Sequence, residues 1–357
     1  MKEKISSSEL SSTLLLCIVS SSIGLNIFTT IRLAGINSYI SVLIGTILGI
    51  IPLFIFIYLF NYQSNLPIYK KNTHIFGKTV GTIINYIIIL LYLLIGATIL
   101  FNLSNFIVSQ YLSRTPLLLI FYIITILVYY TVNKGIETIS RVSTIFSVIT
   151  VLSFLFSFLY LRKDANINNL LPILEQGIKK PLIGAYMSTV ITLSPIYTLL
   201  IIPKNNIVDN KKTSKYIIIS YLIGTTIIFL VAFLSNAILG KYLIEQYQYP
   251  GYISLKRISL FGFIDRIENF LSLHWILSNF ITLTIITYYI SNTIIKEKNN
   301  KILNLLLAII LPIISYKLFT NNTAFNNYTF KVYPYILTIL IFIYIITFIG
   351  AFLKRKK

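Results

Sequence analysis

Long apolar runs separated by short polar segments dominate the chain. Many runs reach 18 residues or more, the length that a helix needs to cross the hydrocarbon core of a bilayer. Because backbone polar groups at that depth must be satisfied internally, the pattern predicts an all-α polytopic membrane protein with one transmembrane domain over residues 1–357. We expect ten spans, at approximately residues 10–32, 38–60, 79–106, 115–133, 141–161, 183–202, 215–239, 264–294, 301–318 and 333–353.

The first and sixth spans carry small and polar residues near mid-membrane. The first contains Ser20-Ser21-Ser22-Ile23-Gly24-Leu25-Asn26, and the sixth contains Ser188-Thr189 and then Thr192-Leu193-Ser194-Pro195. Pro195 lacks an amide hydrogen and clashes with the carbonyl four residues earlier, so a kink or an unwound turn is expected there. Unwound backbone exposes donors and acceptors that a bound polar ligand can satisfy. The alternative is that these small residues only allow close helix packing.

Interruptions at positions one and six of ten are what two inverted five-helix repeats produce. The sequence thus favours repeats over about 10–161 and 183–353, with an outer segment over 240–263. Lys and Arg are more frequent in the loops on the side of the N-terminus, which predicts that both termini are cytoplasmic.

Charged and polar residues gather at the start of the eighth span. A helix-breaking stretch, Tyr249-Pro250-Gly251, precedes a cluster of charged residues that consists of Asp265, Arg266 and Glu268. Charges this close to hydrocarbon either form a site or make an interfacial collar that ends the span. A stripe at three- and four-residue steps follows and is expected to face the bundle interior. The stripe consists of Glu268, Ser272, Trp275, Asn279 and Thr282.

The third span carries a line of four residues that fits either a pocket lining or core packing. The line consists of Leu91, Tyr92, Ile95 and Gly96.

Composition excludes several classes of function. The chain is 56% hydrophobic and 11% charged, with a formal net charge of +20. Its basic residues are dispersed among the loops, so they indicate topology and no nucleic acid partner. The single Cys17 excludes a disulfide framework and a thiolate metal site, and His74 and His274 lack ligand spacing. With no catalytic triad, metal cluster or phosphate-binding glycine loop, we expect no enzyme, metal or cofactor.

The motifs together resemble the spore germination permease family, the B subunits of spore nutrient-germinant receptors. The most specific match is Tyr249-Pro250, then Gly262-Phe263-Ile264-Asp265-Arg266-Ile267-Glu268, then Trp275. Further agreement comes from five shorter stretches in chain order. They are Ile23-Gly24, Phe76-Gly77-Lys78, Arg114-Thr115-Pro116, Gly135-Ile136-Glu137-Thr138-Ile139-Ser140-Arg141, and Asn168-Asn169-Leu170-Leu171-Pro172 with Gly177.

The resemblance implies a LeuT-like bundle of the amino acid–polyamine–cation transporter group. It also implies a nutrient-sensing role at the inner spore membrane, beside A and C subunits. Ligand pockets in such folds lie between spans one, three, six and eight. The candidate ligand-binding residues are therefore Gly24, Asn26, Leu91, Tyr92, Ile95, Thr192, Ser194, Asn279 and Thr282. The candidate structural or coupling residues are Tyr249, Pro250, Asp265, Arg266, Glu268 and Trp275.

Four positions depart from the family pattern. Asn26 and Ile31 stand where the family usually has a second glycine and a later proline, and Pro195 and Tyr197 stand where many members have Gly and Glu. A family ligand therefore cannot be transferred to this chain.

Two functions follow. The first is a receptor subunit that binds a small nutrient, such as an amino acid, and triggers spore germination. The carboxylate of the amino acid would accept hydrogen bonds from the amides near Gly24. The ammonium of the amino acid would donate to the oxygens around Ser194. The second is a secondary transporter of similar solutes. Proton coupling generally uses a carboxylate or histidine inside the membrane, and the acidic residues here fall in loops or at span edges, which favours a sensor or a facilitated path over a proton-driven pump. Sodium coupling through hydroxyl and carbonyl oxygens remains compatible with the second.

Overall fold

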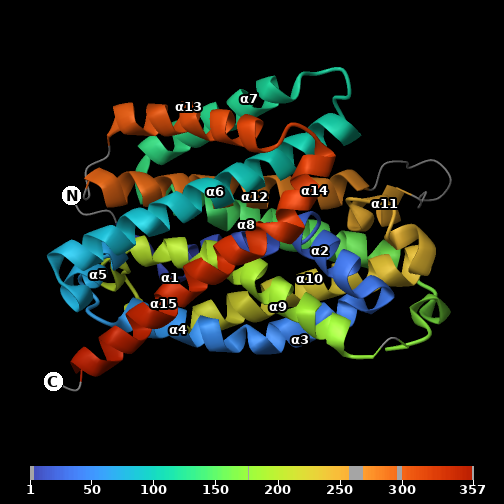
Figure 1. Ribbon diagram of the computed structural model, residues 1–357, viewed down its shortest axis with the longest axis horizontal. Coiled ribbons are helices and arrows are strands. Elements are labelled where there is room, and N and C mark those ends of the chain that lie inside the picture. The colour runs from blue at the N-terminus through green and yellow to red at the C-terminus, as the bar shows by residue number, and fades with distance from the viewer. Residues whose placement is uncertain (1–3, 176, 257–267, 296–299, 356–357) are drawn as a thin grey trace.

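The structure is a computed structural model that describes residues 4–175, 177–256, 268–295 and 300–355, except for the side chains of 270 and 271. Its described part is a bundle of helices with both termini at one end (Figure 1). The helices of the first five spans are α1 (Ser7–Val19) and α2 (Leu25–Ala34), α3 (Ser38–Leu48) and α4 (Ile50–Asn61), α6 (Lys78–Gln110), α7 (Leu117–Asn133) and α8 (Gly135–Leu161). Those of the last five are α9 (Lys179–Leu193) with η3 (Ser194–Ile201), α10 (Thr213–Ile244), α12 (Glu268–Ile295), α13 (Lys301–Leu318) and α15 (Tyr333–Arg355).

Short helices connect the spans. They are η1 (Gly35–Asn37), α5 (Ile68–Phe76), η2 (Ile167–Leu170), η4 (Lys204–Asn206), η5 (Asn210–Lys212), α11 (Pro250–Lys256) and α14 (Asn322–Lys331). Eight helical stretches of the described residues are long and apolar enough to cross a membrane, and Ser7–Val19 and Leu117–Asn133 are shorter apolar helices. The predicted all-α membrane class is confirmed. The division into two repeats stays a prediction.

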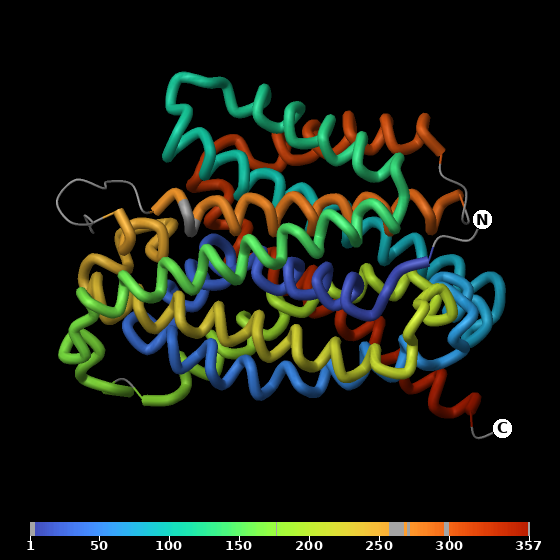
Figure 2. The backbone as a smooth tube through the Cα atoms, turned by 180° about the vertical axis from the view of Figure 1, so that it is seen from behind, coloured from blue at the N-terminus to red at the C-terminus, as the bar shows by residue number. Residues whose placement is uncertain are grey.

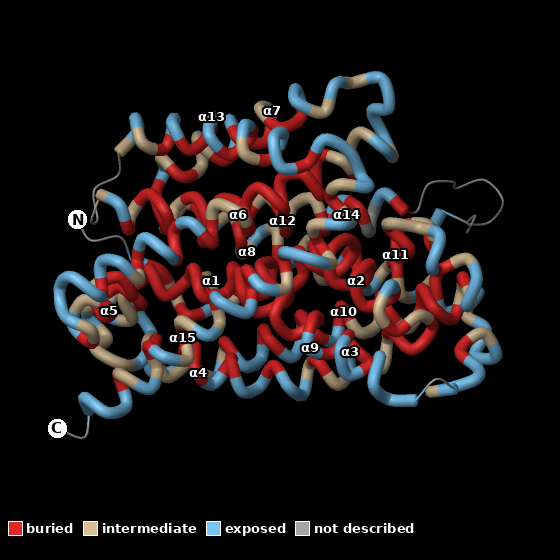
Figure 3. The backbone as a smooth tube through the Cα atoms, in the orientation of Figure 1, coloured by how far each residue is buried: buried red, intermediate tan, exposed pale blue. Residues whose placement is uncertain are grey.

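Helix α1 lies near the centre of the bundle and packs against α8, α10 and α12 (Figure 2). Burial follows this arrangement: α1 and α12 are largely buried, whereas α7 and α13 alternate between buried and exposed positions (Figure 3). Outward-facing apolar residues such as Ile126 and Leu305 are what hydrocarbon-facing helices require. The interior instead holds many buried hydroxyl and amide side chains, which interhelical hydrogen bonds can satisfy.

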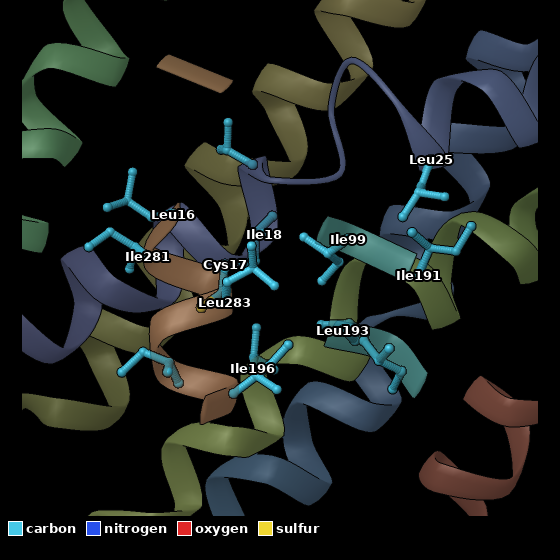
Figure 4. Close-up of a cluster of buried hydrophobic side chains, with 14 of the residues drawn as sticks. Leu16, Cys17, Ile18, Leu25, Ile99, Ile191, Leu193, Ile196, Ile281 and Leu283 are labelled. Carbon is cyan, nitrogen blue, oxygen red and sulfur yellow. The ribbon is translucent and has the colours of Figure 1, made fainter. Parts of the chain in front are cut away.

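Both expected interruptions are present. Helix α1 ends at Val19 and α2 begins at Leu25. The chain leaves the α-helix because the Ser20 and Ser21 hydroxyls donate to carbonyls three residues back, at 2.8 and 3.0 Å, and the backbone tightens to three-residue steps. Figure 4 shows the connecting loop between Ile18 and Leu25, among apolar side chains of α6, α9 and α12.

The sixth span changes from an α-helix to a 3₁₀-helix at Ser194. Pro195 has no amide hydrogen to continue the α-helical pattern, and it occupies the first turn of η3, where that loss is tolerated. The Ser194 and Thr198 hydroxyls donate to Val190 O and Pro195 O, both at 2.6 Å. The expected kink is therefore a change of helix type that is stabilised by neighbouring hydroxyls.

Candidate functional site at the broken helices

The carbonyl of Ser20, at the end of α1, is held by the eighth span. Trp275 Nε1 donates to Ser20 O at 2.7 Å, and Asn279 Nδ2 donates to the same oxygen at 3.1 Å. Trp275 and Asn279 are four residues apart on α12, so both reach one point from one helical face. The predicted polar stripe is indeed buried, and its third and fourth members, Trp275 and Asn279, bind the break in the first span.

Gly24 is packed against two large side chains. A Cβ at this position would lie 2.8 Å from Trp275 Cζ2 and would overlap Asn102 Nδ2 of α6. Only a residue without a side chain fits there, so Gly24 brings the backbone of the break against α6 and α12.

Asn26 joins the two interrupted spans. Its Nδ2 donates to Thr192 Oγ1 at 2.7 Å and to Ser188 Oγ at 3.1 Å, both on α9. Its Oδ1 is buried and has no hydrogen-bond partner among the described residues, and the same holds for Ser22 Oγ. Buried polar atoms are normally hydrogen-bonded, so two unpartnered acceptors beside one helix break indicate a place for a ligand or water.

The backbone at the start of α2 offers donors. Within the described chain, the amides of Ile23 and Gly24 donate to no backbone carbonyl. They lie at the N-terminus of a ten-residue helix, where the helix dipole favours negative charge. The break therefore presents amide donors and side-chain acceptors within one turn.

A small cavity lies beside the Ser188 and Thr192 hydroxyls. Its volume is ≈ 10 Å³, about the space for one water. Its polar lining comes from Thr46, Ser188, Thr189, Thr192, Tyr221 and Thr225. Uncharged hydroxyls on α3, α9 and α10 therefore surround the space next to Asn26.

Tyr92 of α6 contacts the second break. Its hydroxyl donates to Ser194 O at 3.1 Å, and its ring lies against Tyr289 with centroids 5.0 Å apart. The Ser194 carbonyl, expected to meet a ligand ammonium, is thus occupied by a tyrosine of the same chain. Leu91 and Ile95 lie in the apolar core, and Thr282 Oγ1 donates to Ser278 O within α12 at 2.8 Å.

The residues predicted to couple the outer segment converge on α6. Rings of both Tyr249 and Trp275 lie against Phe106, each with centroids 4.9 Å apart. The Tyr249 hydroxyl donates to Asn102 O at 3.3 Å, and Pro250 begins α11. Glu268 is a buried residue at the start of α12, whereas Asp265 and Arg266 lie outside the described residues.

Asn102 and Phe106 were absent from the sequence-based prediction. A signal for them exists, since Tyr92, Ile95, Ile99, Asn102 and Phe106 recur at steps of three and four. Extending the predicted line along α6 by three further steps would have reached both residues.

Fold and site together define an integral membrane protein with the architecture of a LeuT-like transporter. Two solved structures share the fold at 13% sequence identity. A mutant manganese transporter from Eremococcus coleocola aligns with a TM-score of 0.68 and covers 96% of this chain and 78% of its own. Mhp1, a nucleobase-cation-symport-1 family transporter in a closed conformation with bromovinylhydantoin bound, aligns with a TM-score of 0.66 over 95% and 75%.

The chain belongs to the spore germination protein family, whose profile matches residues 4–325. Spore germination protein KB of Bacillus subtilis is 23% identical over 341 residues, which cover 91% of this chain and 89% of that protein. Spore germination protein YndE of the same organism is 28% identical over 259 residues and covers 71% and 69%. Spore germination protein XB of Bacillus anthracis is 24% identical over 254 residues and covers 67% and 69%.

Proposed function

We propose that this chain is the solute-binding membrane subunit of a spore germinant receptor, and that its ligand is a small nutrient of the amino acid class. The observation that carries the proposal is a cluster of polar groups without hydrogen-bond partners at the α1–α2 break, among the described residues. Ser22 Oγ and Asn26 Oδ1 are acceptors without a partner among the described residues, and the Ile23 and Gly24 amides are donors beside them.

An amino acid complements this cluster at both ends. Its carboxylate accepts bonds from the amides at the positive end of the α2 dipole. Its ammonium donates to Ser22 Oγ and Asn26 Oδ1. The side chains that form the break are uncharged, and a zwitterion of zero net charge avoids the large cost of burying an unpaired ion in the membrane interior.

Family membership supports a cellular setting for this proposal. In this proposal the chain resides in the inner membrane of the dormant spore, with both termini on the core side, and acts with A and C subunits. Tyr249, Trp275 and the α11 segment tie the outer face of the bundle to α6, so a change at the break can reach the surface where partners bind.

A secondary transporter is the second candidate, because both solved structures that share the fold are of transporters. Among the described acidic residues, Glu9 and Glu268 come nearest to the interior, and they lie in the first turns of α1 and α12. Those positions are unsuited to a mid-membrane proton relay. Uptake of labelled amino acids in vegetative cells, compared with germination, separates the two functions.

The test is deletion of the gene in the source organism, followed by germination assays with individual nutrients. We expect the response to one or a few amino acids to disappear. Complementation with Asn26→Ala, which removes the Oδ1 acceptor proposed for the ligand ammonium, should raise the required nutrient concentration. Asn236→Ala is the matched control, because Asn236 also bridges two helices, through a 2.8 Å bond to Ser38 Oγ, but lies on α10.

Three results would contradict the proposal. They are an unchanged response in the deletion strain, equal losses in the two asparagine variants at equal protein level, and loss of uptake with normal germination. The last result would favour the transporter.

A further inference from the structure

A second, larger cavity lies at the end of the bundle that carries the termini. Its volume is ≈ 460 Å³, and it lies between α5, the first turns of α6 and the last turns of α12. Its lining residues are Tyr69, Lys70, Thr73, His74, Lys78, Thr82, Asn85, Tyr86, Ile89, Thr293 and Ile294. None of these residues lines the small cavity beside Ser188 and Thr192, so the two cavities are distinct.

The cavity is basic. Among the described residues, its lining includes Lys70, His74 and Lys78, and none of the described lining residues is an aspartate or a glutamate. A third lysine is adjacent, because Lys354 Nζ at the end of α15 donates to the His74 carbonyl at 2.6 Å. The Thr73 and Thr82 hydroxyls already donate to Lys70 O and Lys78 O, so the ammonium groups are the principal donors toward a bound anion.

Tight packing of α5 on α6 brings these cations together. Gly77 turns the chain with φ +83°, a conformation that favours glycine. One turn later, a Cβ on Gly81 would lie 2.5 Å from Thr73 Cα, so the two helices approach with only a hydrogen between them. This close packing places Lys70 and His74 of α5 beside Lys78 and Thr82 of α6, around one cavity.

One side of the cavity opens onto the hydrocarbon-facing surface. Tyr86 lines the cavity and is 62% exposed. Beside Tyr86, α6 carries a line of exposed apolar residues, of which Ile83 and Leu90, three residues before Tyr86 and four after it, are its neighbours on the helix surface. An occupant of this cavity thus meets ammonium groups inside it, and an occupant that extends past Tyr86 reaches this apolar surface of α6.

We propose that this cavity binds an anionic phospholipid, with the phosphate against Lys70 and Lys78 and the acyl chains along the exposed face of α6. Basic pockets between membrane helices at this depth recognise anionic head groups. A phosphodiester with acyl chains satisfies both halves of the lining, whereas free phosphate satisfies only the basic half. The bound lipid also braces α5 against α6.

The experiment measures how much phosphatidylglycerol stays bound to the purified full-length chain, by native mass spectrometry after exchange from vesicles of phosphatidylglycerol and phosphatidylcholine. The Lys70→Gln/Lys78→Gln variant should lose about 30-fold in apparent affinity, since each cation contributes about 1 kcal/mol. Thr82→Trp, which occupies part of the cavity and keeps its charge, should lose retention as well. Lys211→Gln/Lys212→Gln removes two exposed cations of η5 near the same end and should change retention less than twofold.

Two further arms identify the occupant. Inorganic phosphate and glycerol 1-phosphate should fail to displace phosphatidylglycerol, and displacement by either would show a soluble phosphate ligand instead. Equal losses in the η5 control and the cavity variant, or equal retention of phosphatidylcholine, would overturn the proposal in favour of a non-specific basic surface. These readouts are independent of germination, so they can fail without affecting the nutrient-binding proposal.

Discussion

Replacing Gly24 with alanine tests the close packing that defines the break. The new Cβ would lie 2.8 Å from Trp275 Cζ2 and would overlap the Asn102 amide, so α2, α6 or the Trp275 ring must move. Overpacking of a filled site costs about 1–3 kcal/mol. Gly96→Ala in α6 is the matched control. Its Cβ would meet Leu311 and Ile286 at 3.4 and 3.5 Å, which are ordinary contacts.

The expected difference between the two glycine variants is large enough to measure. Alanine is favoured over glycine in a helix interior by about 1 kcal/mol, so Gly96→Ala should be neutral or stabilising. The gap between the variants should then be about 2–4 kcal/mol in unfolding free energy. The assay is thermal or denaturant unfolding of the purified protein in one detergent, with germination response as the second readout.

A third variant identifies the clashing partner. Asn102→Ala removes the side chain that a Cβ at position 24 would overlap. Gly24→Ala combined with Asn102→Ala should therefore be less destabilised than the sum of the single variants, by about 0.5–3 kcal/mol. Equal stability of Gly24→Ala and Gly96→Ala, or additive effects in the double variant, would refute the close approach.

Three further predictions concern single contacts. Trp275→Phe should lower the unfolding free energy by only about 0.5–1.5 kcal/mol, because Asn279 still donates to Ser20 O. Trp275→Phe combined with Asn279→Leu leaves that carbonyl unpaired, so the loss of unfolding free energy in the double variant should exceed the sum of the two single losses. Additive losses would contradict this. Burial lowers the pKa of Lys71 in α5 to about 7, so the unfolded chain binds the extra proton between pH 7 and its ordinary value of 10.5. Stability should thus rise with pH across that window, by at most about 1.4 kcal/mol per pH unit, and Lys71→Met should flatten the rise in a pH series of unfolding midpoints. His274 is fully buried with both ring nitrogens unpartnered among the described residues, so His274→Leu should be neutral or stabilising by about 1–3 kcal/mol, and loss of the nutrient response at normal protein level would show a functional role.

The spans were predictable because the thickness of the bilayer sets the length of a crossing helix. In addition, every backbone N–H and C=O group in the bilayer must be hydrogen-bonded within the protein, which leaves few possible structures. The predicted 38–60 span corresponds to α3 and α4, and the 79–106 span to α6. Helix α5 was not expected, since the nine residues Ile68–Phe76 are too short and too polar for a transmembrane pattern. Its position depends on Gly81, whose close contact with Thr73 is a tertiary feature without a periodic signal.

Within the site, local chemistry was predictable and pairing was not. The serine run with Gly24 indicated where the first helix breaks, because hydroxyls compete for backbone carbonyls. The stripe on α12 indicated that Trp275 and Asn279 face inward. Their shared partner, Ser20 O, is more than 250 residues away in sequence, and no pattern within one span encodes that contact. The same applies to Tyr92 and Ser194 O.

The size of the cavity beside Ser188 and Thr192 constrains how the proposed nutrient could act. A space of ≈ 10 Å³ beside Asn26 holds about one water and excludes an amino acid. In the proposed function, an amino acid at Asn26 therefore needs a larger space, which loss of the Asn26 bonds to Ser188 and Thr192 on α9 would open. A ligand shifts such an equilibrium only by its differential affinity, and reversing a 1:99 population takes about 5.5 kcal/mol.

Thr192→Val tests this exchange directly. It removes one bond of the closed arrangement, at about 0.5–1.5 kcal/mol, and leaves the α2 amides untouched. If the closed contact competes with the ligand, the nutrient concentration for half-maximal germination should fall by about 2- to 12-fold. Thr225→Val is the control, because Thr225 lines the same cavity but donates within α10, to Tyr221 O. A raised nutrient requirement in Thr192→Val would show that Thr192 binds the ligand itself, so that opening at Asn26 is not what limits the response.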